Sequence, residues 1–288
     1  MALDAAPAPA WMKDRESFDA ELRSRGMIGY WMIPTRSIGF REPKAAYSPH
    51  LWKWDSLREI AYGAVTHVPK EEAHRRFVGL HHPELKAGTA PHYFLGCQLL
   101  QAREKAPAHR HTMDALRFVV QGDGGACTSN DGEPFPMRKW DLITTPNWCW
   151  HDHINESDTD TIWLDGAVSP LIGHFNVGFS EPYEGDRFHP RTRPADWSNA
   201  SSGALRPRNA RPQGPRQRAH RYAWTETARI LDTLATSPAD PFDDLVLTYT
   251  DPFTGGPVLP TLGAEIQDRK STRLNSSHIP LSRMPSSA

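Results

Sequence analysis

Cysteine is scarce in this chain, which has only three, Cys97, Cys127 and Cys149, with no CxxC spacing. An odd and sparse set of this kind excludes a disulfide-built secreted domain and favours reduced thiols in a cytoplasm. Long apolar runs are also missing, because no segment reaches the roughly 18 apolar residues that a membrane-spanning helix needs. The Ala/Pro-rich start lacks the basic and apolar regions of a signal peptide. We therefore expect a cytoplasmic enzyme.

An excess of charge of one sign is the third absence. The formal net charge is -1, so no overall electrostatic field gathers nucleic acid or acidic partners. The remaining composition, 38% hydrophobic and 23% charged over 288 residues, is that of a globular protein of one or two domains. Membrane, fibrous and nucleic-acid-binding proteins are therefore not indicated.

Histidine is what the chain does have, with 14 residues. Two groups, His109-Arg110-His111 and His151-Asp152-His153, lie in stretches that favour strands. Alternate residues of a strand point to one face, so the first two histidines share a face and the arginine between them points away. A third histidine from a neighbouring strand completes a ligand set for iron, zinc, copper or nickel, with positions left for substrate and oxygen. Histidines without a metal are the alternative, and His81-His82 is a pair expected by chance.

The first 180 residues divide into an N-terminal arm and a strand-rich region. The arm, residues 1–76, has an amphipathic helix over Asp14–Arg25, an aperiodic stretch around Trp52 and Trp54, and a short helix after Pro69. Residues 77–180 contain short β-rich runs separated by turns, which predicts an all-β sandwich or jelly-roll barrel. The clearest runs are Tyr93–Leu100, Leu116–Gln121, Leu142–Thr145 and Thr161–Asp165.

Composition changes again after residue 180. Residues 181–221, rich in Arg and Pro, indicate a linker; a nucleic-acid-binding arm is the alternative, with few aromatics for base stacking. Residues 222–267 are expected to begin a second domain, with a helix over Trp224–Leu234 capped by Thr225 and strands over Leu245–Tyr249 and Val258–Gln267. Residues 268–288 resemble a translated sequencing adapter, so we expect natural sequence to stop near Gln267 and the second domain to be truncated.

Several motifs together resemble the gentisate 1,2-dioxygenase family of cupins. They are Ala106–Thr112, Ala115–Phe118, Trp148–His153, Trp163–Gly166 and, farther out, Pro49–Trp52 and Thr254–Pro260. The resemblance covers most of residues 45–267 and implies a cupin, a double-stranded β-helix or jelly-roll barrel. Family members usually carry two such barrels in one chain and assemble as tetramers, and only the beginning of the second barrel is expected here.

The resemblance also implies a site in which His109, His111 and His151 bind Fe(II). Cupins in general add a glutamate ligand soon after the HxH motif, but Ala115 and Leu116 stand there, as in the gentisate family. A three-histidine face leaves more positive charge on the iron than a face with a carboxylate, which favours an anionic chelating substrate. Gentisate is such a substrate, and the implied reaction opens its ring with both atoms of O2 to give maleylpyruvate.

Further roles come from the same resemblance. Arg117, on the alternation parity of the ligands, is expected to pair with the substrate carboxylate, and His153 to hydrogen-bond a substrate hydroxyl, to move a proton or to serve as an alternative ligand. Asp165 is expected to orient one of the histidines. The implied substrate-binding residues are Gln98, Arg75, Arg76 and Gly96. The alternatives are structural: an ion pair for Arg117, a turn cap for Asp165, a core amide for Gln98, and a solvated helix face for the arginine pair.

Two departures from the family leave the substrate open. Family members usually have glycine where Trp140 precedes Asp141, so a turn that needs positive φ would be strained here. Phe94 stands where some members have tryptophan, and Gly96 leaves room beside it. The alternative functions are a salicylate or 1-hydroxy-2-naphthoate 1,2-dioxygenase, a metal-binding cupin without turnover, and a cupin isomerase. A fragment that folds poorly is a further alternative.

Overall fold

The N-terminal part of the chain forms a small helical unit of its own. The computed structural model describes residues 9–33, 47–73, 75–184, 187–200, 219–237 and 243–268. It separates into two compact units, Met1–Pro49 and His50–Ala288. The first contains η1 (Ala10–Met12), α1 (Arg15–Ser24) and η2 (Tyr30–Met32). The Asp14 side chain accepts a hydrogen bond from the Ser17 N–H at 2.8 Å and caps α1, so the helix expected there is confirmed.

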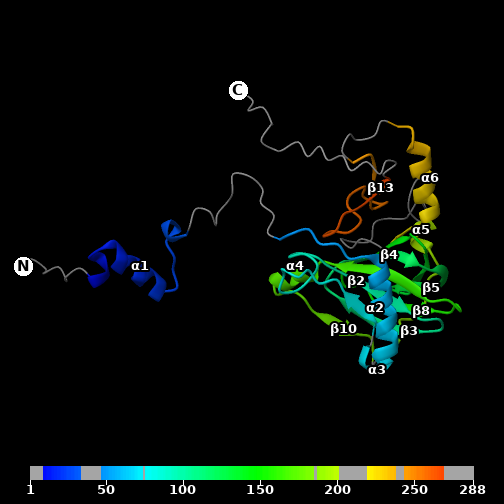
Figure 1. The fold of residues 1–288 in the computed structure, drawn as a ribbon, viewed down its shortest axis with the longest axis horizontal. Coiled ribbons are helices and arrows are strands. Elements are labelled where there is room, and N and C mark those ends of the chain that lie inside the picture. Colours follow the sequence, from blue (N-terminus) through cyan, green and yellow to red (C-terminus); the bar gives the residue numbers. More distant parts are fainter. Residues whose placement is uncertain are drawn as a thin grey trace, which may run out of the picture. The chain divides into compact units, whose positions relative to one another are not determined.

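The second unit is built mainly of two antiparallel sheets (Figure 1). The six-stranded sheet has the order β1-β2-β9-β4-β7-β11 and the five-stranded sheet the order β10-β3-β8-β5-β6. The first sheet consists of β1 (Phe77–Gly79), β2 (Phe94–Leu100), β9 (Thr161–Ala167), β4 (Ala115–Gln121), β7 (Leu142–Thr145) and β11 (Arg221–Tyr222). The second consists of β10 (Ser180–Pro182), β3 (Lys105–His111), β8 (His151–Asn155), β5 (Asp123–Asn130) and β6 (Glu133–Arg138). The predicted all-β jelly-roll architecture is confirmed.

Alternation along the strands fills the space between the sheets. Both sheets contribute to one apolar cluster, which contains Leu100, Ala106, Val119, Phe135, Met137, Ile143, Trp163 and Ala219. Each large apolar side chain buried in this way contributes about 1.5–3 kcal/mol to stability. In the same strands the inward positions nearer one end of the barrel are polar, and these positions form the site described below.

A helix covers the outer face of the six-stranded sheet. α2 (Trp54–His67) packs on β2 (Figure 1), and its Ala61 joins Cys97, Leu99 and Ile162 in a second buried cluster. The expectation of an aperiodic stretch here is wrong from Trp54 onward, because Trp54, Leu57, Ala61 and Val65 recur at helical spacing and all pack on this cluster. The other short helices of this unit are α3 (Lys70–Ala73), α4 (Ser169–His174) and α5 (Trp197–Ala200). Within the described residues no helix has the length and apolar character needed to cross a membrane.

After the barrel the chain forms α6 (Trp224–Leu234) and a two-stranded sheet of β12 (Leu245–Tyr249) and β13 (Ala264–Asp268). The helix has the expected bounds, but the expected cap is wrong. Ala223, not Thr225, is the N-cap, and the Asp141 carboxylate accepts the Trp224 N–H at 2.8 Å in place of a local cap. β13 is shorter than expected, because the chain first turns through an isolated bridge between Leu259 and Leu262.

The proposed boundaries between barrel, linker and second domain stay predictions. Segment 187–200 of the predicted linker returns to the barrel, where Ser198 donates two hydrogen bonds to the buried Glu133 carboxylate. Residues 201–218 and the adapter-like residues 269–288 lie outside the described part of the chain.

Candidate metal centre and substrate pocket

Three histidines from two neighbouring strands converge inside the barrel. His109 and His111 end β3, and His151 begins β8 directly opposite His109 in the sheet register. One potential ligand nitrogen from each lies within 4.8 Å of the other two. The ring centroids are 4.2 to 5.3 Å apart, so all three imidazoles face one small volume. Strand alternation and cross-strand pairing together produce this convergence.

Hydrogen bonds fix the orientation of two of these rings. The Nδ1 atom of His111 lies 2.9 Å from the Met113 carbonyl oxygen, and that of His151 lies 3.0 Å from the Cys149 carbonyl oxygen. A carbonyl only accepts, so Nδ1 carries the proton in both rings and Nε2 keeps its lone pair. His109 differs, because Nη2 of Arg75 lies 2.5 Å from its Nδ1 and donates to it. Arg75 and a bound cation therefore cannot use that nitrogen at the same time.

The electrostatic environment keeps the three imidazoles neutral. Burial lowers the pKa of each histidine, and the nearby positive charges of Arg75 and Arg117 lower it further. A neutral imidazole is the form that binds a metal, since protonation removes the lone pair. A buried triad of neutral nitrogen donors on one face fits a divalent transition metal with open positions. The residues present therefore fit the iron that the sequence led us to expect.

A pocket of about 200 Å³ opens beside the triad. Its polar wall includes Arg75, Gln98, Arg117 and Asp165. Arg117 is 1% exposed, its Nε lies 3.4 Å from an Asp165 carboxylate oxygen, and its Nη1 donates to the Thr145 hydroxyl at 2.5 Å. Burial lowers the pKa of Arg75 to about 9, with the charge of Arg117 adding to the effect, so Arg75 is still a cation at neutral pH. Two guanidinium groups near a metal site suit an anionic ligand.

Part of the pocket lining is apolar. Phe77 and Phe94 meet edge to face with ring centroids 5.5 Å apart, and Met113, Ala115 and Ala167 also line the pocket. Gly96 lies beneath this pair, because a Cβ atom built there would come within 2.2 Å of the Phe77 ring. A flat ring with an anionic group matches a pocket lined by both phenyl rings and guanidinium groups.

Three residues expected at the site are placed elsewhere around it. His153, Arg76 and Gly96 are not among the described residues that line the pocket. His153 is fully buried behind the triad against Trp163, with no hydrogen-bond partner for either ring nitrogen among the described residues. Arg76 points away from the triad and forms a buried ion pair with Glu104. Asp165 contacts Arg117 and Trp163 rather than a histidine.

Sequence reasoning missed several residues that line or support this pocket. Phe77 follows Arg75 by two positions in extended chain, so alternation alone would have placed both on one face. Thr145 lies inward on β7, where it links Arg117 to Asn130 by accepting from the first and donating to the second. Met113 and Ser169 lie between strands, where no periodic signal points to a pocket.

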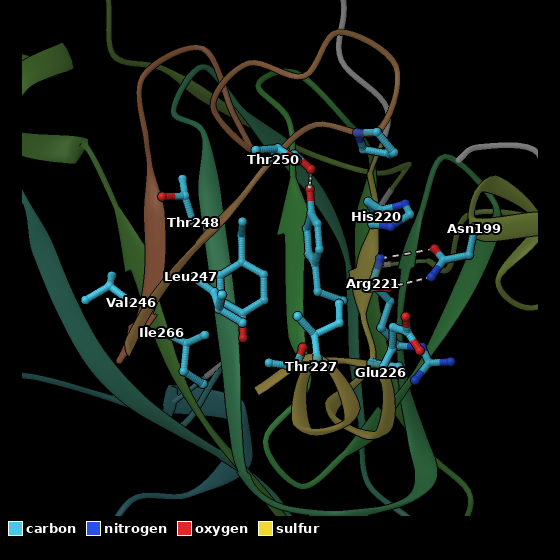
Figure 2. A pocket seen from close by; sticks show the side chains of 15 residues that line it. Asn199, His220, Arg221, Glu226, Thr227, Val246, Leu247, Thr248, Thr250 and Ile266 are labelled. Atoms are coloured by element: carbon cyan, nitrogen blue, oxygen red, sulfur yellow. Dashed lines mark hydrogen bonds between the residues drawn. The ribbon is translucent and has the colours of Figure 1, made fainter. Parts of the chain in front are cut away.

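A second and larger cavity, about 550 Å³, lies between α6 and the β12–β13 sheet (Figure 2). Its lining is mainly aliphatic and aromatic, and the Tyr222 hydroxyl donates to the Thr250 carbonyl oxygen across it at 2.9 Å. It contains a single histidine, His220, whereas a cluster of metal-binding side chains occurs, among the described residues, only at His109, His111 and His151. The chemistry of the molecule therefore centres on the smaller pocket.

Comparisons with known proteins agree with this geometry. A family model described as a cupin domain matches residues 97–166. The chain is 35% identical to gentisate 1,2-dioxygenase 1 of Aquipseudomonas alcaligenes, over 90% of this chain and 75% of that protein. It is 34% identical to 1-hydroxy-2-naphthoate 1,2-dioxygenase of Nocardioides sp. (strain KP7), over 95% of this chain and 73% of that protein. The crystal structure of a salicylate 1,2-dioxygenase from Pseudaminobacter salicylatoxidans matches with a TM-score of 0.76 and 31% identity, covering 88% of this chain and 75% of that one.

Proposed function

The chain belongs to the gentisate 1,2-dioxygenase family of cupins, which are ring-cleaving oxidoreductases, and from this premise we propose that it is an Fe(II)-dependent gentisate 1,2-dioxygenase. The observation that carries the proposal is a neutral three-histidine cluster beside a pocket lined by two guanidinium groups and two phenyl rings. The substrate class is an aromatic hydroxy acid, and the co-substrate is O2. The ring-opened product of gentisate would be maleylpyruvate.

In this proposal His109, His111 and His151 hold the iron, which when bound supplies the site where substrate and O2 meet and exchange electrons. Arg117 and Arg75 neutralise the substrate carboxylate, and Asp165 holds Arg117 in place by an ion pair. Arg75 has to leave His109 if the iron takes Nδ1 of that ring, which would free its guanidinium for the substrate.

The remaining pocket residues orient the ring. Phe77 and Phe94 contact its face or edge, and Gln98 offers an amide to a hydroxyl group. His153 stays neutral, because burial lowers its pKa well below the usual value, so it is a poor base and is better suited to hydrogen-bond a substrate hydroxyl than to take up a proton. Since it does not line the pocket, a hydrogen bond between it and the substrate requires a bridging water molecule. Arg76 supports the pocket through Glu104.

A second candidate is cleavage of salicylate or 1-hydroxy-2-naphthoate. Relatives named for those substrates are about as similar to this chain as a gentisate enzyme is, at 31% and 34% identity against 35%. Two further proposals accompany the function. We expect a homo-oligomer, a tetramer for a full-length parent, and a cytoplasmic location, for which the three free cysteines are the support.

Oxygen uptake tests the proposal directly. The chain is loaded anaerobically with Fe(II), its iron content is measured, and gentisate, salicylate and 1-hydroxy-2-naphthoate are then added in turn in air. We expect one O2 consumed per gentisate, and neither bound iron nor uptake in a His111→Ala variant. Bound iron without uptake on any of the three acids would contradict the proposal and favour a metal-binding cupin without turnover.

A further inference from the structure

Arg110 stands between two of the proposed iron ligands but points away from them, to the outer face of β3. Its guanidinium carbon lies 4.2 Å from the ring centroid of Trp148 and 4.3 Å from that of Trp150. Its Nε and Nη2 both donate to one carboxylate oxygen of Glu181, at 2.9 and 2.7 Å. We call Arg110, Trp148, Trp150 and Glu181 the arginine sandwich.

The two tryptophans belong to the turn that delivers the third ligand. Trp148 and Trp150 precede His151, and the Trp148 N–H donates to the His111 carbonyl oxygen at 2.7 Å. Trp148 adopts φ +58°, a conformation that costs an ordinary residue of the order of 1 kcal/mol and that neighbouring contacts must hold. The Trp150 N–H donates to the Asp131 carboxylate at 2.9 Å, which fixes the other end of the turn.

Each ring of the sandwich is held by a further aromatic contact. Phe179 meets Trp148 with ring centroids 4.8 Å apart, and Tyr183 meets Trp150 at 4.9 Å. Both residues flank β10, which pairs with β3 so that Glu181 lies opposite Arg110. The sandwich therefore joins the strand with two ligands, the turn with the third ligand and the edge strand β10.

We propose that the arginine sandwich is a positioning device that sets the spacing of the three imidazoles and thereby the metal affinity of the site. The proposal rests on the proposed metal site, though not on its substrate. A planar guanidinium can stack between two indole rings, which a lysine ammonium cannot do. Strand alternation converts the fixed outward position of Arg110 into fixed inward positions of His109 and His111. Partners of this kind around metal ligands typically change metal affinity about 10- to 100-fold when they are removed.

The test uses two substitutions in the full chain and Co(II) as the probe metal. Arg110→Met removes both the positive charge and the planar guanidinium group but keeps a long side chain. Arg110→Lys keeps the positive charge but replaces the planar guanidinium group with an ammonium group. Arg103→Met is the matched control, because Arg103 forms an exposed ion pair with Asp158 away from the triad. The Co(II) dissociation constant and visible spectrum are measured anaerobically with a competing chelator, and the thermal midpoint is measured on metal-free protein.

We expect Arg110→Met to weaken Co(II) binding about tenfold or more and to change the Co(II) spectrum, at temperatures where the metal-free variant is folded. Arg110→Lys should be intermediate and Arg103→Met should bind as the unmodified chain does. Unchanged Co(II) affinity and spectrum in folded Arg110→Met, or in Arg110→Lys if the first variant does not fold, would overturn the proposal. An unmodified chain that binds no Co(II) would overturn both this inference and the metal site. Metal binding without dioxygenase activity would overturn the proposed function alone.

Discussion

Arg117 is a nearly inaccessible cation whose protein partners leave part of its charge for a ligand. Asp165 lies 3.4 Å from its Nε, and the Thr145 hydroxyl accepts from its Nη1. The pocket beside it also holds Arg75, so the site as a whole carries more positive than negative charge. A bound carboxylate would balance that excess, which is why we assign Arg117 to substrate binding rather than only to an ion pair.

We expect Arg117→Met to raise KM for gentisate about 10- to 100-fold, because a hydrogen bond to a charged group contributes ~1.5–3 kcal/mol. Arg117→Lys should raise KM less, since lysine keeps the positive charge but lacks the planar guanidinium group. Steady-state oxygen uptake on iron-loaded protein measures both variants. An unchanged KM in Arg117→Met would return this residue to a structural role.

Phe77 is one of the apolar residues that line the pocket and is 36% exposed. Its removal would widen the pocket where a second fused ring has to fit. We expect Phe77→Ala to raise kcat/KM for 1-hydroxy-2-naphthoate relative to gentisate by about tenfold, in the range that pocket size usually provides. Val78→Ala, on the other face of the same strand, is the control and should leave the ratio unchanged. The same ratio in both variants would rule out Phe77 as a determinant of specificity.

Among the elements, the strands that carry the site were the most predictable. β2, β4, β7 and β9 lie within a few residues of their expected bounds, because alternation and turn residues mark them clearly. α2 was missed, although its apolar residues recur at helical spacing, because its N-cap residue, Lys53, provides no capping side chain to mark where the helix begins. The N-cap of α6, Ala223, was missed because no local side chain caps the helix. The Trp224 N–H instead donates to the carboxylate of Asp141, 83 residues earlier in the chain. A local rule contains no information about such a distant partner.

The residues of the site also differ in how far the sequence predicts their positions. The ligand strands and the inward position of Arg117 follow from alternation, whereas the pairing of Arg76 with Glu104 depends on tertiary packing. The contact of Arg75 with His109 joins residues 34 positions apart and could not be predicted from spacing. Pocket residues between strands, such as Met113, give no periodic signal at all.

The turn between β6 and β7 shows how a departure from the family is accommodated. Trp140 has φ +71°, as expected of a position where relatives usually have glycine, and its ring stacks on Phe118 with centroids 5.7 Å apart. The backbone conformation costs about 1–2 kcal/mol for a residue with a Cβ atom, and the ring contact offsets part of that cost.

We expect Trp140→Ala to be less stable than Trp140→Gly by about 1 kcal/mol, because both lose the ring but only alanine keeps the strain. Urea unfolding of the two variants measures the difference. Alanine is the better residue at ordinary exposed positions, so a more stable Trp140→Ala would mean that this turn is not strained in solution.

Across the whole molecule, buried neutral histidines tie stability to pH. Burial lowers the pKa of five of the described histidines, His109, His111, His151, His153 and His220. His220 lies at the larger cavity, away from the triad, and burial lowers its pKa to about 4 against the opposing effect of Asp251 and Asp196. As pH falls below about 6.5, the unfolded chain takes up a proton before the folded one does. The stability that neutral His220 provides is therefore present above pH 6.5 and is lost between about 6.5 and 4.

We expect the free energy of unfolding of the metal-free chain to fall as pH decreases from 7 to 5, and His220→Gln to reduce that slope. One such histidine contributes at most about 1.4 kcal/mol per pH unit. Chemical denaturation across this range measures the slope, and His67→Gln, at the exposed end of α2, serves as the control. Equal slopes in the unmodified chain and His220→Gln would contradict the assignment.

The proposed function is the opening of an aromatic ring with both atoms of O2. Its most direct test is one turnover experiment with ¹⁸O2, gentisate and the iron-loaded chain, followed by mass analysis of the product. We expect a ring-opened product that contains two ¹⁸O atoms when it is analysed before its keto oxygen exchanges with water. A ring-opened product without ¹⁸O, or a hydroxylated product with the ring intact, would contradict the proposed function.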